Sequence, residues 1–228
     1  RARLSRRRSS RPRCASIRGN EPAAPDMTAP PNLPFIDVAP RDVEGWAARF
    51  TAPDLPVLAS TAEAIEGLRP LEDDVDAHLL SETVAVDPLM TLKVLQHVGQ
   101  LRRGREGSDT ETVTASLVMM GITPFFRVFG PQPTVEEHLA SRPEALEGFR
   151  RVLKRSHRAA NFAIGFAVHR FDHDAPVIHE AALLHDFAEM LLWLRAPSLA
   201  LEIARRQQAD PTPRSADVQK QVLNVQLH

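Results

Sequence analysis

From Leu55 onward, apolar residues recur at three- and four-residue steps along almost the whole chain, and this helical period constrains the fold more than any other feature. Leu58, Ala62, Ile65 and Leu68 form the first such stripe. Apolar and polar residues do not alternate over any run of strand length, and tyrosine, a residue that strands favour, is missing altogether. The pattern predicts an all-α fold, a compact multi-helix bundle.

Residues with strong positional preferences punctuate this period and bound the expected helices. Asp87 is a favourable N-cap, and Pro88 suits the first helical position. Gly121 is placed to end the helix before it. The helices expected lie over residues 43–50, 57–68, 77–86, 88–98, 112–120, 123–129, 143–171, 176–194, 198–208 and from 215 to the chain end.

Two capping boxes precede the second half of the chain. In this motif a Ser or Thr side chain and a Glu side chain each bond a backbone N–H group of the helix start. Thr134-x-x-Glu137 is the first, and Ser141-x-x-Glu144 would begin the longest helix. On that helix the expected apolar stripe is Leu146, Phe149, Leu153, Ala160, Ile164 and Phe171.

The N-terminal segment 1–54 is expected to be disordered or loop-rich, ahead of a helical domain over 55–228. Residues 1–26 hold eight arginines against Glu21 and Asp26, and they show no hydrophobic period. An Arg-rich arm for nucleic acid or a transit peptide is one interpretation. A natural start at Met27, with 1–26 an upstream translation artefact, is the simpler one, because the chain does not begin with Met.

Composition excludes several classes of protein. Cys14 is the sole cysteine, so no disulfide framework and no cysteine-based zinc site forms within the chain. A reducing cytoplasm is therefore the simplest location. No apolar run approaches the roughly 18 residues of a membrane helix, and we expect no membrane contact. The net charge of −1 gives no overall bias toward nucleic acid, which is an unlikely partner.

Histidines are the main candidate functional residues, because the sequence has no nucleophile elbow, no phosphate-binding glycine loop and no His-Glu-x-x-His motif. His157 and His185 both fall on the predicted inner faces of long helices, and Asp186 follows His185 directly. Two imidazoles and a carboxylate between packed helices are a possible divalent-metal site. The alternative is that each histidine is a hydrogen-bonded core residue, which is the commoner role for a single inward histidine.

In four stretches the chain resembles the HDOD domain, a non-enzymatic relative of the HD metal-dependent phosphohydrolases in bacterial signalling proteins. The match covers roughly residues 55–228, and the order of the stretches makes it more specific than any one of them. They are Leu55-Pro56-Val57-Leu58, the Asp-Pro helix Asp87-Pro88-Leu89 to Leu95, Val113 to Ile122 with Met120-Gly121-Ile122, and Ser156-His157 followed by Ala181 to Asp186.

The resemblance implies a degraded metal site. HD hydrolases use a His, then a His-Asp pair, then a distant Asp, and His157, His185 and Asp186 match the first three. No later Asp is a convincing fourth, since Asp210 and Asp217 fall in a loop and at a helix start. Glu189 stands where hydrolases commonly have a lysine, and it would repel a phosphate. The resemblance also implies a domain that continues past residue 228.

These expectations favour a regulatory, protein-interacting module of bacterial signal transduction that lacks catalysis and has other signalling proteins as partners. It would need no cofactor, although weak binding of a divalent metal at His157, His185 and Asp186 remains compatible with the pattern. The alternative is an HD-type phosphohydrolase acting on a phosphoester or nucleotide. A nucleic-acid-binding role would depend on the arginines of 1–26 and on Arg102, Arg103 and Arg105.

Overall fold

The computed structural model describes residues 34–50, 55–102 and 110–227. Predictions for the arginine-rich segment, for Met27 and for most of the loop at 99–109 lie outside these residues. Within them every regular element is helical, which confirms the all-α prediction. The helices are α1 (Val43–Phe50), α2 (Ala59–Leu68), the 3-10 helix η1 (Arg69–Asp74), α3 (Ala77–Val84), α4 (Pro88–Arg102), α5 (Val113–Met120), α6 (Ile122–Val128), α7 (Val135–His138), α8 (Pro143–His169), α9 (Ala175–Leu184), α10 (Phe187–Arg195), α11 (Pro197–Ala209) and α12 (Ser215–Leu223).

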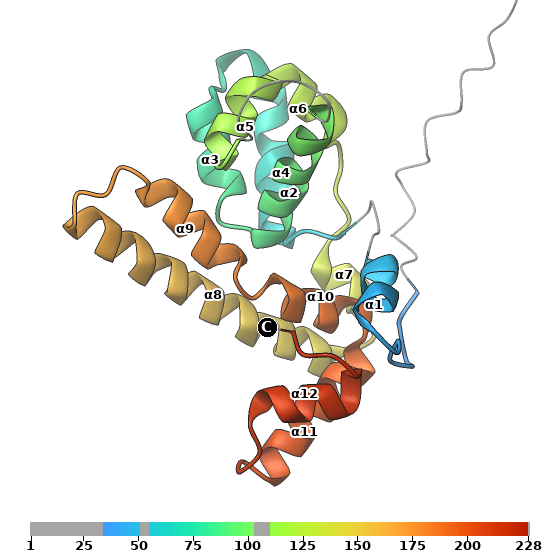
Figure 1. Ribbon diagram of the computed structural model, residues 1–228. Helices are drawn as coiled ribbons and strands as arrows, with labels where there is room; N and C mark the ends of the chain where they lie inside the picture. The colour runs from blue at the N-terminus through green and yellow to red at the C-terminus, as the bar shows by residue number, and fades with distance from the viewer. Residues whose placement is uncertain (1–33, 51–54, 103–109, 228) are drawn as a thin grey trace, which may run out of the picture.

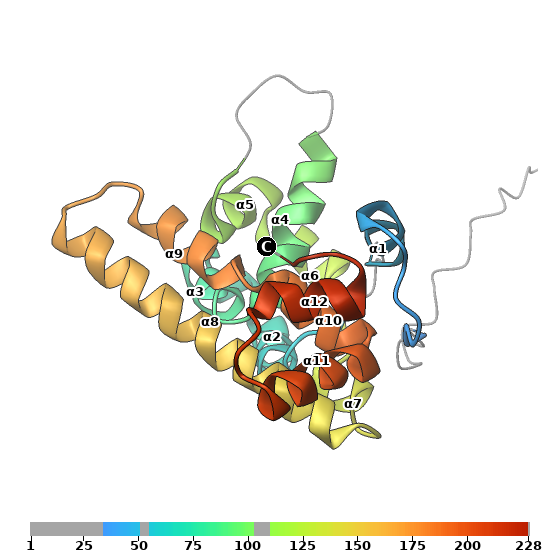
Figure 2. The ribbon, with the colours of Figure 1, turned by 60° about the horizontal axis from the view of Figure 1, so that its bottom comes forward.

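The helices gather into two lobes around separate apolar cores. The first lobe holds α2 to α6, and its largest buried side chains include Phe125, Leu80 and Leu117. The second lobe holds α1, α7, α10, α11, α12 and the first half of α8, around Phe149 and Trp193. Figure 1 shows the first lobe above the long rod of α8, with α9 alongside that rod. Turned by 60°, the molecule shows α10, α11 and α12 close together (Figure 2).

Backbone contacts and one shared helix join the lobes. Val57 pairs with the segment before α7 in an isolated parallel bridge, donating its N–H to Pro133 O at 2.9 Å and accepting from Val135 at 2.8 Å. On α4, Leu89 is buried in the second core while the adjacent Met90 is buried in the first. The two lobes therefore share a helix as well as a strand-like bridge.

Residues 34–50 belong to the packed body. Helix α1 forms where predicted, and the rings of Trp46 and Phe50 lie 5.2 Å apart. The Trp46 indole donates to the carbonyl of Leu223 at 2.9 Å, and the Ile36 N–H donates to the carbonyl of Arg195 at 2.6 Å. This segment, placed by the sequence outside the helical domain, thus covers the second lobe near its C-terminal helices.

Most predicted helix ends are confirmed. The Asp87 carboxylate accepts from the N–H groups of Leu89 and Met90, and Gly121 has φ of +83° after α5. The Thr134–Glu137 capping box is formed in full. The box expected at Ser141 is wrong: Arg142 is the residue before α8, no side chain caps it, and Pro143 supplies the first turn instead.

Three predicted boundaries differ from the structure. The helix expected over 176–194 is two helices, α9 and α10, separated at residues 185–186. There the Ser156 hydroxyl donates to the Leu183 carbonyl, an acceptor that a continuous helix pairs with the N–H of Phe187. Helix α4 runs on to residue 102, and α12 ends at Asn224, whose φ is +64°.

The buried face of α8 differs from the predicted stripe. Its distal half packs chiefly against α9 (Figure 1), so large side chains there have little to cover them. Phe171, expected inside, is 89% exposed, and Phe162 and Phe166 are also exposed. Phe149 and Ala160 are buried as predicted, and Leu146 and Leu153 pack against the second core. The buried face consists of Ala145, Gly148, Phe149, Val152, Ser156, Ala160 and Ala167. In the described part of the chain, no helix has the length and apolar character that a membrane crossing needs.

Candidate functional site

The three predicted ligand residues lie where α8 meets the turn between α9 and α10. Asp186 is buried at this turn, as its position predicts. The His185 side chain is 71% exposed, so its predicted inward orientation is wrong. The reason is that α9 buries the face that holds Glu180 and Leu183, whereas Ala181, one turn before His185, is exposed. His157 is half-buried on α8.

One ring nitrogen of His157 is engaged with the backbone of the first lobe. His157 Nε2 lies 2.7 Å from the carbonyl oxygen of Val86, in the segment between α3 and α4. Because a carbonyl oxygen can only accept, this contact places the ring hydrogen on Nε2. The contact ties α8 to the first lobe.

His179 on α9 lies close enough to His157 for their charges to interact. Burial lowers the pKa of His179, and the neighbouring His157 lowers it further. The side chain of His179 is half-buried. The charged form of the His179 imidazole is therefore disfavoured.

The Asp186 carboxylate is bound by two side chains. It accepts a hydrogen bond from Arg155 Nε at 2.8 Å, and its other oxygen lies 3.0 Å from His185 Nδ1. Burial alone would raise the pKa of Asp186, but the bonds from Arg155 and His185 outweigh it and hold that pKa below its usual value. Asp186 is therefore an ionised carboxylate whose lone pairs face a guanidinium.

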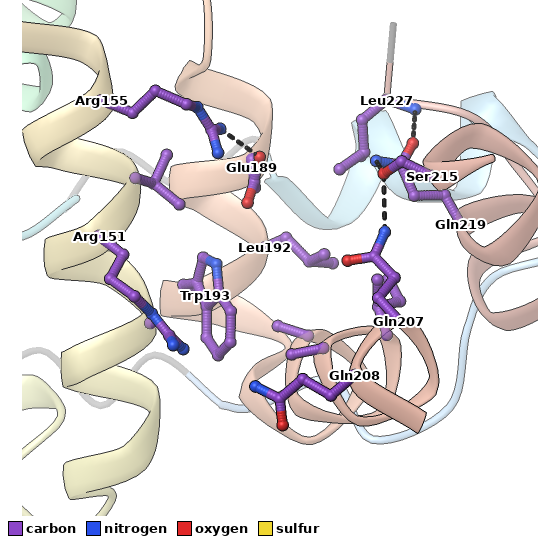
Figure 3. Close-up of a pocket in the computed structure, with 15 residues that line it drawn as sticks. Arg151, Arg155, Glu189, Leu192, Trp193, Gln207, Gln208, Ser215, Gln219 and Leu227 are labelled. Atoms are coloured by element: carbon purple, nitrogen blue, oxygen red, sulfur yellow. Dashed lines mark hydrogen bonds and ion pairs between the residues drawn. The ribbon is translucent and has the colours of Figure 1, made fainter. Parts of the chain in front are cut away.

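Arg155 also binds Glu189, which stands where HD hydrolases commonly have a lysine. Its Nη2 lies 2.5 Å from Glu189 Oε2 (Figure 3), so one guanidinium bridges Asp186 and Glu189. Sequence reasoning did not single out Arg155. The sequence alone carries no clear signal for this pairing, because Arg155 on α8 and Glu189 on α10 meet only when the helices pack. The structure thus places a protein cation beside the Asp of the His-Asp pair.

As they lie, these residues do not fit a divalent ion. A metal needs carboxylate and imidazole lone pairs directed at one point, and here Arg155 binds one Asp186 oxygen while His185 Nδ1 contacts the other. Over residues 34–50, 55–102 and 110–227, no three His, Cys, Asp or Glu side chains are grouped to hold a metal ion. Asp210, considered as a distant fourth ligand, bonds Thr212 instead. A ligand role for His157, His185 and Asp186 stays a prediction.

A buried carboxylate that the sequence did not reveal links α9 to the first lobe. Both oxygens of Glu180 accept from the N–H of Val113, at 3.0 and 2.9 Å, at the start of α5. Burial raises the pKa of Glu180 to about 7, although the bond from Val113 opposes that rise. This carboxyl therefore changes charge near neutral pH while holding a helix N-terminus.

Comparison with known proteins gives a family and a fold. The family model described as HDOD domain matches residues 55–228, which confirms the resemblance seen in the sequence. Among solved structures, the chain is similar to the MmoQ response regulator from Methylococcus capsulatus str. Bath. That similarity has a TM-score of 0.58 at 18% identity and covers 77% of this chain and 69% of MmoQ. No curated protein matches the sequence.

Proposed function

Because the chain belongs to the HDOD domain family, we propose that it is a regulatory, protein-interacting module of bacterial signal transduction that lacks catalysis. One observation carries the proposal: Arg155 occupies both Asp186 and Glu189. A metal-dependent phosphohydrolase needs the Asp of its His-Asp pair free for the metal, and it needs a cation to attract the substrate phosphate. Here the carboxylate is neutralised by a side chain, and the second position is itself acidic.

The ion pair between Arg155 and Asp186 is compatible with a stable fold but disfavours metal-dependent hydrolysis. The guanidinium supplies the positive charge that a buried Asp requires, so the helix packing around Asp186 does not depend on a bound ion. Unlike a metal ion, the guanidinium does not coordinate a water molecule. It therefore neither lowers the pKa of a bound water nor acts as a Lewis acid. These features support a scaffold that other molecules bind, and they disfavour hydrolysis.

The partners we propose are other signalling proteins of the bacterial cytoplasm. The fold resembles that of a protein named as a response regulator, which supports a signalling context. Outside residues 1–26 the chain holds 20 basic and 27 acidic residues, so a partner with basic patches would be favoured. Asp73 and Asp74 are exposed at the end of η1 and contribute to this negative field.

Metal content and hydrolysis test the absence of catalysis. Purified protein should carry well below one Mn, Fe or Zn per chain by elemental analysis, and it should not hydrolyse phosphomonoesters, nucleotides or cyclic dinucleotides. A metal content near one per chain, lost together with hydrolytic activity in His185→Ala, would establish the phosphohydrolase alternative instead. His185 suits this variant because its side chain is mostly exposed, so the fold should tolerate alanine.

Binding of partners tests the positive half of the proposal. Tagged protein would be used to capture partners from the native cell, and each captured protein would be purified and its affinity measured. Asp73→Asn with Asp74→Asn should weaken binding of a basic partner, whereas Glu147→Gln, an exposed acid on α8, controls for a change in charge elsewhere. Failure to measure direct binding to any signalling protein would contradict the proposal.

A further inference from the structure

A cavity of about 350 Å³ lies beside the Arg155–Glu189 ion pair. It is a partly open cleft lined by α8, α10, α11 and α12, and Leu227, near the end of the described chain, lines one side (Figure 3). A volume of roughly 300–1,000 Å³ is typical of cavities that hold small organic ligands, and it exceeds what an inorganic ion needs. The cavity lies outside the His157–His185–Asp186 group, although Arg155 contributes to both.

Two arginines and one carboxylate line this cavity. Arg155 pairs with the carboxylate, Glu189, and is shared with Asp186 outside the lining, so it is not free to bind a ligand. Arg151 is exposed and extends along the α8 wall next to Trp193 (Figure 3), and no acceptor within the described residues binds it. A ligand that pairs with the Arg151 guanidinium is an anion.

Amide side chains from α11 form the opposite wall. Gln207 donates from Nε2 to the Ser215 hydroxyl at 2.8 Å, which leaves its carbonyl oxygen as an acceptor toward the cavity. Gln208 lines the cavity with both its amide donor and its amide acceptor unpaired within the described residues. The remaining lining is largely apolar, with Leu192, Ile203 and Leu227 facing the cleft.

Taken together, the lining residues lead us to infer that this cavity binds a small organic phosphate. A phosphate monoester presents three terminal oxygens and carries more negative charge than a carboxylate, so it can accept from the forked guanidinium of Arg151 and from the amide of Gln208 together. The apolar wall and the Gln207 carbonyl suit an organic body with its own N–H or O–H groups. This site goes beyond the proposed scaffold role and does not depend on it.

Isothermal titration calorimetry on the full chain tests this inference. The probes are adenosine 5′-monophosphate, ribose 5-phosphate, adenosine and inorganic phosphate. At least one organic phosphate should bind more tightly than inorganic phosphate and than the unphosphorylated nucleoside. Arg151→Gln should weaken that binding about tenfold or more, since a hydrogen bond to a charged group contributes about 1.5–3 kcal/mol. Arg150→Gln, one residue along on the exposed surface of α8 and outside the cavity lining, should leave it unchanged.

Three outcomes of the calorimetry would contradict binding of an organic phosphate. The inference is overturned if neither organic phosphate binds at millimolar concentration, or if inorganic phosphate binds as tightly as both. Equal weakening by Arg150→Gln and Arg151→Gln would also overturn it, because the attraction would then be a general surface effect. None of these outcomes bears on whether the chain hydrolyses substrates or binds signalling proteins, so the two proposals are tested separately.

Discussion

Arg155 and Asp186 form an ion pair, with 2.8 Å between Nε and Oδ2, that fastens α8 to the turn between α9 and α10. The Asp186 side chain is 12% exposed and the Arg155 side chain 47% exposed, so the carboxylate is the buried partner. Glu189 shares the same guanidinium. Removing Arg155 would therefore leave both carboxylates without the guanidinium that they share.

Arg155→Leu should lower the free energy of unfolding by about 1–2 kcal/mol, a value kept small because half of the arginine is solvated. Urea denaturation measures the change. Arg158→Leu is the matched control, because Arg158 is exposed on the same helix and makes no hydrogen bond or ion pair within the described residues. Equal effects of the two variants would show that the ion pair adds nothing to helix packing.

Glu180 should make stability fall as pH rises toward neutrality. Burial raises its folded-state pKa to about 7, above the value in an unfolded chain. The folded state then holds the proton more tightly, so stability is highest below the unfolded pKa and declines as pH rises through the folded pKa.

Glu180→Gln keeps an acceptor for the N–H of Val113 but cannot ionise. Unfolding free energies measured from about pH 5 to pH 8 should fall less in this variant than in the wild-type chain. Parallel pH profiles for the two proteins would contradict the assigned role of Glu180.

Local patterns predicted the fold well where neighbours in sequence determine the geometry. The caps at Asp87 and Thr134 and the stop at Gly121 formed as expected, because each depends on contacts within a few residues. The break at 185–186 could not be predicted in this way. It involves the hydroxyl of Ser156 on another helix, and the apolar period runs through the break without interruption.

The candidate site also has some features that the sequence predicts and others that depend on how the helices pack. Its position was predictable, because His157 and the His185-Asp186 pair follow the order of the family motif. The orientation of His185 and the role of Arg155 were not, since both depend on how α8 packs against the turn after α9. The acidic Glu189 was noticed as a departure, but its partner on α8 becomes evident only when the two helices are side by side.

Gly148 should be indispensable to the contact between α8 and α10, while Gly165 on the same helix should not. A Cβ at position 148 would lie 2.4 Å from two atoms of the Trp193 ring, but one at position 165 would meet nothing within 4 Å. Gly148→Ala should destabilise by about 1–3 kcal/mol through overpacking. Gly165→Ala should stabilise by about 0.5–1 kcal/mol, because alanine restricts the unfolded chain. Thermal denaturation of both variants should shift in opposite directions, and a shared direction would contradict the packing.

The buried guanidinium of Arg195 should lower the free energy of unfolding. Replacing Arg195 with a hydrophobic residue should raise it. The residue is 6% exposed at the end of α10, and its Nε and Nη1 are buried with no hydrogen-bond partner among the described residues. Burial lowers the pKa of its guanidinium, and no carboxylate in the described part of the chain offsets that cost. Arg195→Met keeps a long flexible side chain of similar reach and removes the buried donors, so it should raise the free energy of unfolding by about 1–2 kcal/mol. Arg195→Lys retains a charge and should give no such gain. If methionine destabilises the protein as much as lysine does, the guanidinium has an acceptor in solution and the buried donors are satisfied there.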